Sequence, residues 1–381
     1  IGTTSIGNAA TSDLNFTSTI YKFDGATTIT AASGDTIDMG AGAATTFTTA
    51  ADNITFATGN IELANGSNLT VDTGAAGGNI TIGEIAGTSV ETVTLDAGTG
   101  TTSVGVIGSG TEIGALSIGS AENGGITLNG AITTDGVVTL DGPITLATGA
   151  ITITTADDAI NLQGTVDGGQ ALTLSSGSAA ITADGAIGSS TALTSLTVNS
   201  SGAGTIEITD IGTSSAAGVS GATAIGNTST GTLTLDGTVY TTTGSQTYTA
   251  ATGGGNIDIT NTAGTTFTTT NTAIAFNTSG VDLANNATTT IDTGTAAGDV
   301  TFQGAIETNG GDNDILTVTS GTGTVTFTGA IGATEELGGL NVNASSGNGV
   351  ITFTSTIGDS GNAGVIGTTS IGNAATSDLN F

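Results

Sequence analysis

Several residue types on which protein chemistry usually depends are missing from this chain of 381 residues. It has no cysteine, histidine, arginine or tryptophan, and its single basic side chain, Lys22, faces 32 acidic ones. Without cysteine there is no disulfide framework and no thiol chemistry. Without histidine or cysteine there is no Ser-His-Asp or Cys-His constellation and no zinc site of the usual type. Carboxylates are left as the only side chains for acid–base catalysis.

The charge balance also limits the partners that the chain can bind. The formal net charge is −31. Binding of nucleic acid requires lysine and arginine to neutralise phosphates, so no nucleic-acid partner is expected. No run approaches the ~18 consecutive apolar residues of a membrane-crossing segment, so no membrane span is expected. The acidic surface predicts non-specific screening by divalent cations such as Ca²⁺, and no cofactor.

What the chain does contain is a repeated alternation of apolar and small polar residues. One motif fills residues 181–198, and its second part returns without a gap at residues 105–118 and 329–342. A shorter motif, apolar-x-apolar-x-Gly-x-apolar, occurs six times between residues 126 and 331. Alternation with period two predicts strands, because successive side chains point to opposite faces. Glycine at a fixed place, such as Gly185, is expected to break the strand by turning to positive φ.

The spacing of these motifs predicts the fold class. Gly304, Gly329 and Ser355 hold the same place in three successive copies of the shorter motif. The length of one copy suits a coil of two or three short strands, which becomes stable only when coils stack. We therefore predict an all-β chain that forms a parallel β-solenoid, a right-handed β-helix of about 15 coils of roughly 20–26 residues without caps.

The same alternation predicts which residues form the core. Phe302, Phe327 and Phe353 occupy one place in successive copies, so we expect an interior column with ring centres about 5 Å apart. Threonine and serine should remain outside, since β-branched threonine fits a pleated surface and its hydroxyl stays hydrated. The inward residues of the longer motif are predicted to be buried: Ile181, Ile187, Leu193, Leu196 and Val198.

Repetition also exists on a longer scale. Residues 1–16 reappear unchanged as residues 366–381, which gives a period of 365 residues. A looser similarity relates 46–49 to 266–269 and, at the same offset, 61–65 to 281–285, as if a block of coils had been duplicated. We predict one continuous solenoid over 1–381, made of one period (1–365) and the start of the next. The expected partner is a further copy of the chain, by head-to-tail stacking and by lateral bundling.

Carboxylates that lie close together in the sequence are the remaining site candidates. Adjacent strand residues face opposite sides, so the pairs Asp157-Asp158 and Glu335-Glu336 are interpreted as solvated turns rather than catalytic pairs. Asp312 and Asp314 follow two glycines and carry the hard oxygen atoms that calcium prefers. The segment lacks the EF-hand and glycine-rich nonapeptide spacings, so a polar turn is favoured over a calcium site. No catalytic or cofactor-binding residue is predicted.

Three phrases, at residues 165–174, 192–199 and 244–248, resemble the giant bacterial β-strand-repeat surface proteins. Those are similar in turn to filamentous-haemagglutinin and autotransporter adhesin passengers. The resemblance implies export to the cell surface and a structural or adhesive role, and it supplies no site residues. We therefore expect a non-enzymatic extracellular fibre or surface shaft. The alternatives are an adhesin whose solenoid face binds a glycan or protein of a host surface, and a β-helical polysaccharide enzyme.

Overall fold

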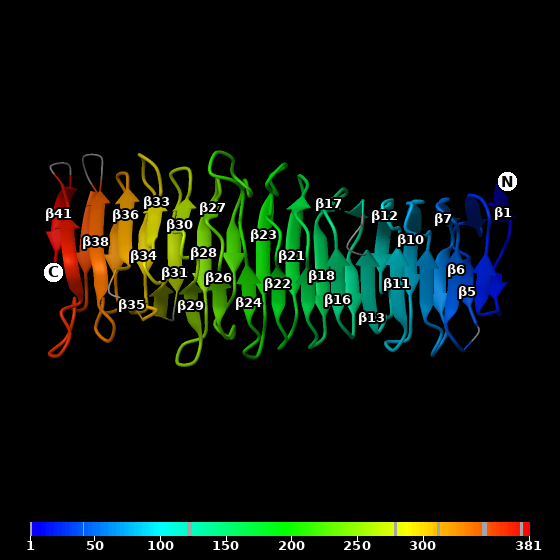
Figure 1. Cartoon of the computed structure of the whole chain (residues 1–381), viewed down its shortest axis with the longest axis horizontal. Coiled ribbons are helices and arrows are strands. Elements are labelled where there is room, and N and C mark those ends of the chain that lie inside the picture. Colours follow the sequence, from blue (N-terminus) through cyan, green and yellow to red (C-terminus); the bar gives the residue numbers. More distant parts are fainter. Residues whose placement is uncertain are drawn as a thin grey trace. The chain divides into compact units, whose positions relative to one another are not determined.

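The computed structural model describes residues 2–40, 42–119, 124–277, 280–310, 313–344, 349–373 and 376–381. Within these ranges every regular element is a strand, so no helix is present there that could cross a membrane. Parallel strands stack coil upon coil as a β-solenoid of right-handed type with about 15 turns (Figure 1). The predicted fold class is therefore confirmed.

Contacts group the chain into two compact units. The first comprises Ile1–Gly177 with Thr182–Gly185, and the second comprises Ser178–Ile181 with Ala186–Phe381. Strand β22 (Ile181–Ala183) spans the sequence boundary between them. One continuous array over all residues stays a prediction.

In the first unit, most coils contribute three strands, which form three parallel stacks. The first stack contains β1 (Thr4–Gly7), β4 (Thr27–Thr30), β7 (Ile54–Thr58), β10 (Ile80–Ala86), β12 (Thr101–Ile107), β14 (Gly125–Leu128), β17 (Ile144–Leu146) and β20 (Val166–Asp167). The second contains β2 (Leu14–Phe16), β5 (Thr36–Met39), β8 (Asn60–Leu63), the ends of β10 and β12, β15 (Ile132–Thr134), β18 (Ile151–Thr155) and β21 (Ala171–Ser175). The third contains β3 (Ile20–Lys22), β6 (Thr45–Thr48), β9 (Leu69–Asp72), β11 (Thr92–Asp96), β13 (Ala115–Gly119), β16 (Val138–Asp141) and β19 (Ile160–Leu162).

The second unit has the same arrangement of three parallel stacks. One contains β23 (Ser195–Asn199), β25 (Thr223–Ile225), β28 (Gln246–Thr249), β31 (Ile274–Asn277), β34 (Val300–Phe302), β37 (Val325–Phe327), β39 (Gly349–Phe353) and β41 (Thr376–Asn380). Another contains β24 (Ile206–Ile208), β26 (Leu233–Leu235), β29 (Asn256–Ile259), β32 (Gly280–Leu283) and β35 (Ile306–Thr308). The last contains β27 (Val239–Thr241), β30 (Thr265–Thr268), β33 (Thr288–Asp292), β36 (Ile315–Ser320), β38 (Leu337–Ala344) and β40 (Val365–Ile371).

Pairing in register places like residues above one another and builds the core. Val300 pairs with Val325, and Val325 with Ile351, while the threonines between the inward residues face outward. The inward residues of the longer motif are all fully buried, as predicted: Ile181, Ile187, Leu193, Leu196 and Val198. Burial of an aliphatic side chain contributes roughly 1.5–3 kcal/mol, so the stacked inward rows are the main source of stability.

The predicted phenylalanine column is confirmed. The ring centroids of Phe302 and Phe327 lie 5.3 Å apart, and those of Phe327 and Phe353 lie 4.9 Å apart, with planes within 9° of parallel. The column also includes Phe276, 4.8 Å from Phe302, and Tyr248, 5.2 Å from Phe276. One interior row of rings therefore runs through successive coils of the second unit.

The reason expected for the motif glycines is wrong at Gly185 and Gly329. Neither has a positive φ, and a Cβ atom at either would collide with the backbone of the glycine one coil earlier, Gly164 or Gly304. These glycines are required because two backbones approach closely. The positive φ falls three positions later in the motif, at Gly188, where φ is +70°. Gly188, and not Gly185, therefore makes the sharp turn.

Aromatic packing supports the relation between the two similar blocks, of which 46–49 and 266–269 are parts. In the first unit, Phe47 stacks on Tyr21 with centroids 5.0 Å apart and meets Phe56 edge to face at 5.4 Å. In the second unit, Phe267 stacks on Tyr240 at 4.8 Å and meets Phe276 edge to face at 5.4 Å. The two blocks thus share a packing pattern as well as a sequence pattern, as expected of a duplication.

Candidate functional site

Asp314, one of the two calcium candidates, is a buried residue that directly precedes β36. Its side chain has no exposed surface, and its Oδ1 accepts a hydrogen bond from the backbone N–H of Asn286. Asn286 has a φ of +58° and lies in the turn one coil earlier. The carboxylate therefore fixes a tight turn of the neighbouring coil. Asp312, the other candidate, lies outside the described residues.

Glu91 fills a similar place in the first unit. It directly precedes β11, is fully buried, and its Oε1 accepts a 3.1 Å hydrogen bond from the backbone N–H of Gly66, the counterpart of Asn286 in the duplicated block. The backbone N–H of Thr88 donates to Oε2 at 2.6 Å. Burial alone would raise the pKa of Glu91, but the hydrogen bonds from Thr88 and Gly66 outweigh burial and lower the pKa below its usual value. Both acids thus brace turns.

Sequence reasoning did not single out Glu91, although a signal for it exists. An acid stands two positions before an inward apolar residue, and a glycine or asparagine, residue types that favour positive φ, stands at the matching turn one coil earlier. Asp314 has the same signal. In the part of the chain that the structure describes, no three acidic side chains form a group that could hold a metal ion.

The adjacent acid pairs lie in turns, as predicted. Asp157 and Asp158 follow β18, and the Asp157 side chain is exposed. Glu335 and Glu336 precede β38, and Glu336 Oε1 accepts a hydrogen bond from the backbone N–H of Ala363 at 3.3 Å. The Glu336 carboxylate therefore binds the turn at Ala363, whereas the Glu335 side chain is exposed.

A second kind of acidic feature consists of carboxylates stacked on neighbouring strands. In the first unit, Asp38 of β5 pairs in register with Glu62 of β8. Partial burial raises the pKa of Glu62, and the negative charges of Asp38 and Glu84 raise it further. This row of three acids therefore holds like charges close together.

The second unit repeats the paired acids of this row, since Asp258 and Asp282 correspond to Asp38 and Glu62 in the duplicated block. Asp258 pairs in register with Asp282, and Asp282 with Glu307. Asn256 lies beside the row, and its Nδ2 donates to Asp258 Oδ1 at 2.9 Å and also to Asp282 Oδ2. Burial and the charge of Asp258 raise the pKa of Asp282, against the effect of the hydrogen bond from Asn256. The amide thus bridges two carboxylates that would otherwise only repel.

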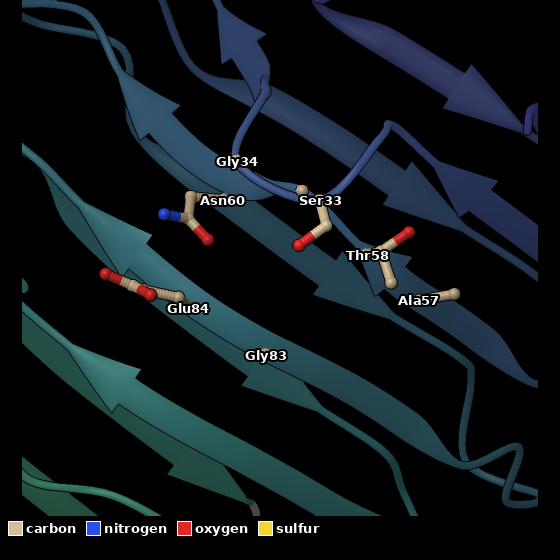
Figure 2. Close-up of a pocket in the computed structure, with 8 residues that line it drawn as sticks. Ser33, Gly34, Ala57, Thr58, Asn60, Gly83 and Glu84 are labelled. Atoms are coloured by element: carbon tan, nitrogen blue, oxygen red, sulfur yellow. The ribbon is translucent and has the colours of Figure 1, made fainter. Parts of the chain in front are cut away.

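A shallow hollow of about 320 Å³ opens at one corner of the first unit. Figure 2 shows Ser33, Thr58, Asn60 and Glu84 around it, from a turn and from strands β7, β8 and β10. Ala57, with its small side chain, and Gly83, which has none, complete the wall. A single carboxylate and three neutral polar groups therefore line this space.

The second unit has a larger hollow, of about 510 Å³, at the matching corner. Phe276 pairs in register with Phe302, as Phe56 pairs with Ile82 in the first unit. The residues that directly follow them therefore correspond: Asn277 and Gln303 in the second unit take the places of Ala57 and Gly83 in the first. Side chains of neutral residues line this hollow, and they include Ala224, Asn227, Thr247, Thr249, Asn277 and Gln303. The two corners therefore differ in chemistry although they share a position in the fold.

No known family model, no curated protein and no solved structure matches this chain. The resemblance to bacterial surface proteins stays a prediction.

Proposed function

We propose that this chain is a stretch of an extracellular or cell-surface shaft built from tandem solenoid periods, with a structural and non-enzymatic role. The observation that carries the proposal is that the two copies of the repeated segment pair with neighbouring coils in opposite directions. The copy at residues 1–16 forms β1 and β2, which pair with the coil that follows. The copy at residues 366–381 forms all of β41 and all of β40 except Val365, and both strands pair with the preceding coil.

The two copies therefore use opposite edges of the same pair of strands. Ile6 pairs forward with Ile29, and its counterpart Ile371 pairs backward with Val342. Leu14 likewise pairs forward with Ile37, and its counterpart Leu379 pairs backward with Ile351. A coil with this sequence can thus pair on both edges, with register shifts between Leu337 and Gly339 and between Gly349 and Val350 on the backward side. Such a coil lets one period continue into the next without a break in the stack.

The placement of the carboxylates supports a structural role. Glu91 and Asp314 are buried and brace turns, while Glu307 accepts hydrogen bonds from the backbone N–H groups of Thr334 and Glu335 at 3.1 and 3.0 Å. These acids stabilise the corners of coils, and the resemblance described above supports an exported location.

A two-period chain tests the proposal. It contains residues 1–365 twice, followed by residues 366–381, and its length is measured by negative-stain imaging and small-angle X-ray scattering. We expect one shaft that is longer than the single-period chain by about 70 Å, since about 15 coils rise by about 4.8 Å each.

The control is the same chain with a flexible Gly/Ser linker of about 20 residues between the periods, which should give two bodies joined by a hinge. If the direct fusion also gives two hinged bodies, the periods do not stack in register and the proposal fails.

A further inference from the structure

The larger hollow, in the second unit, is an open depression with room for a small molecule. Its volume of about 510 Å³ lies within the range of roughly 300–1,000 Å³ that is usual for ligand pockets. The side chains of Ala224 and Thr247, neighbours in register on β25 and β28, border it on one side. The small Ala224 leaves room that a threonine would fill.

Two amide groups of this hollow directly follow members of the column of rings. Asn277 and Gln303 directly follow Phe276 and Phe302, whose rings stack 4.8 Å apart with planes 4° from parallel. Thr249 pairs in register with Asn277. The column of rings beneath them therefore sets the spacing of the backbone from which these three side chains extend.

A fourth group, Asn227, is fixed by its own hydrogen bonds. Its Nδ2 donates to the carbonyl oxygen of Ser200 at 2.9 Å, and its Oδ1 accepts from the backbone N–H of Ser229 at 2.8 Å. The side chain thus holds its turn against the edge of the hollow, and the second N–H of the amide is available at that edge.

The chemistry of the lining selects the class of ligand. Among the described residues that line this hollow none carries a carboxylate, so no lining side chain there would neutralise a cationic ligand. An anionic ligand would meet no positive charge and a protein of net charge −31. Carboxamides and hydroxyls both donate and accept hydrogen bonds, as do the hydroxyl groups of a sugar. The lining therefore suits a neutral polyhydroxyl compound.

We propose that this hollow binds a neutral saccharide. Asn277 and Gln303 hydrogen-bond to sugar hydroxyls, Thr247 and Thr249 add further donors and acceptors, and Ala224 contacts a ring face. The corner of the first unit, with Ala57 and Gly83 in place of the two amides and with Glu84 nearby, does not bind it. This inference is independent of the shaft proposal, because it concerns one corner within one unit.

The test is a titration of the 381-residue chain with neutral tetrasaccharides of glucose, galactose, mannose and N-acetylglucosamine. Binding is followed by calorimetry and by the NMR signals of side-chain amide groups, with tetragalacturonate as an acidic comparison. We expect at least one neutral saccharide to bind with Kd below about 10 mM and to shift the Asn277 and Gln303 amide signals. Tetragalacturonate should not bind.

Matched variants locate the site. Asn277→Ala with Gln303→Ala should weaken binding by about tenfold or more, since two hydrogen-bonding groups are lost. Asn60→Ala with Glu84→Ala alters the corresponding corner of the first unit and should leave the affinity unchanged. Circular dichroism and melting temperature check that both double variants fold. The proposal is overturned if no neutral saccharide of the panel binds, if the acidic one binds equally well, or if the Asn277/Gln303 variant retains full affinity.

Discussion

At the scale of single residues, the two buried acids show how a chain with almost no positive charge accommodates carboxyl groups in its interior. Backbone N–H groups take the place of lysine and arginine as partners of Glu91 and Asp314. Hydrogen bonds to a charged acceptor contribute roughly 1.5–3 kcal/mol each, about twice as much as those between neutral groups. Turns with positive φ supply these donors at Gly66 and Asn286.

Glu91 makes the stability of the fold depend on acid pH. The pKa of Glu91 is lowered in the folded chain, so its contribution is fully present above the unfolded pKa of about 4.3 and is lost as the pH falls through the folded value. We expect Glu91→Gln to lower the free energy of unfolding by about 1–3 kcal/mol at pH 7. The difference from the unaltered chain should shrink below about pH 4, as measured by urea unfolding across that range.

The matched control is Glu335→Gln, which removes a charge from an exposed turn position and should change stability by less than about 0.5 kcal/mol. If Glu91→Gln lowers the free energy of unfolding by the same amount at every pH, the size and packing of the Glu91 side chain, and not its ionisation, stabilise the fold.

At the scale of strands, the column of rings fixes the register of β31, β34, β37 and β39. Each ring fills the space between the rings of the preceding and following coils, with centroids about one strand spacing apart. A strand that slipped by one residue would turn its ring to the solvent. The column therefore contributes both stability and specificity of pairing.

Truncation of one ring tests this role. Phe327→Ala should lower the free energy of unfolding by about 3–5 kcal/mol, because it leaves a cavity between Phe302 and Phe353. The measurement is denaturant unfolding followed by circular dichroism. Thr326→Ala, on the outward side of the same strand, is the control and should change stability by less than about 1 kcal/mol. Equal losses at the two positions would contradict an interior column.

The outcome at particular residues shows what a periodic sequence can predict. Inward positions such as Leu196 and Phe327 followed from alternation and spacing, since those patterns fix which face a side chain occupies. The different roles of Gly185 and Gly188 could not be predicted in this way, because both residues are glycines. Whether a glycine is needed for close contact between backbones or for a positive φ depends on the neighbouring coil.

The candidate sites also depend on neighbouring coils, which the order of residues along the chain does not show. The roles of Glu91 and Asp314 depend on donors one coil away in sequence that stacking brings close. The hollow beside Asn277 depends on side-chain sizes across several coils, among them Ala224 and Gln303. Neither feature is a motif of contiguous residues, so neither could be found by its spacing alone.

At the scale of the whole molecule, the excess of acids should govern how chains meet side by side. Rows such as Asp38–Glu62 and Asp258–Asp282–Glu307 concentrate negative charge, and chains of net charge −31 repel at low ionic strength. We expect millimolar Ca²⁺ or Mg²⁺ to promote lateral bundles, and chelation to disperse them while leaving the melting temperature of single chains unchanged. Light scattering and calorimetry measure the two effects.

The control is the double variant Asp258→Asn with Asp282→Asn, which removes two charges from one row. This variant should need a higher cation concentration to reach the same light scattering. A large fall in melting temperature on chelation would point to specific structural ions and would contradict simple screening.

The single lysine has a practical consequence. Trypsin cuts only after lysine or arginine, so Lys22, exposed at the end of β3, is the one cleavage point in all 381 residues. If each following period carries its own copy, a denatured array is cut once per period into fragments of equal mass. The bands of a partial digest would then form a ladder whose step is the mass of one period, and the number of steps would count the periods in the natural protein.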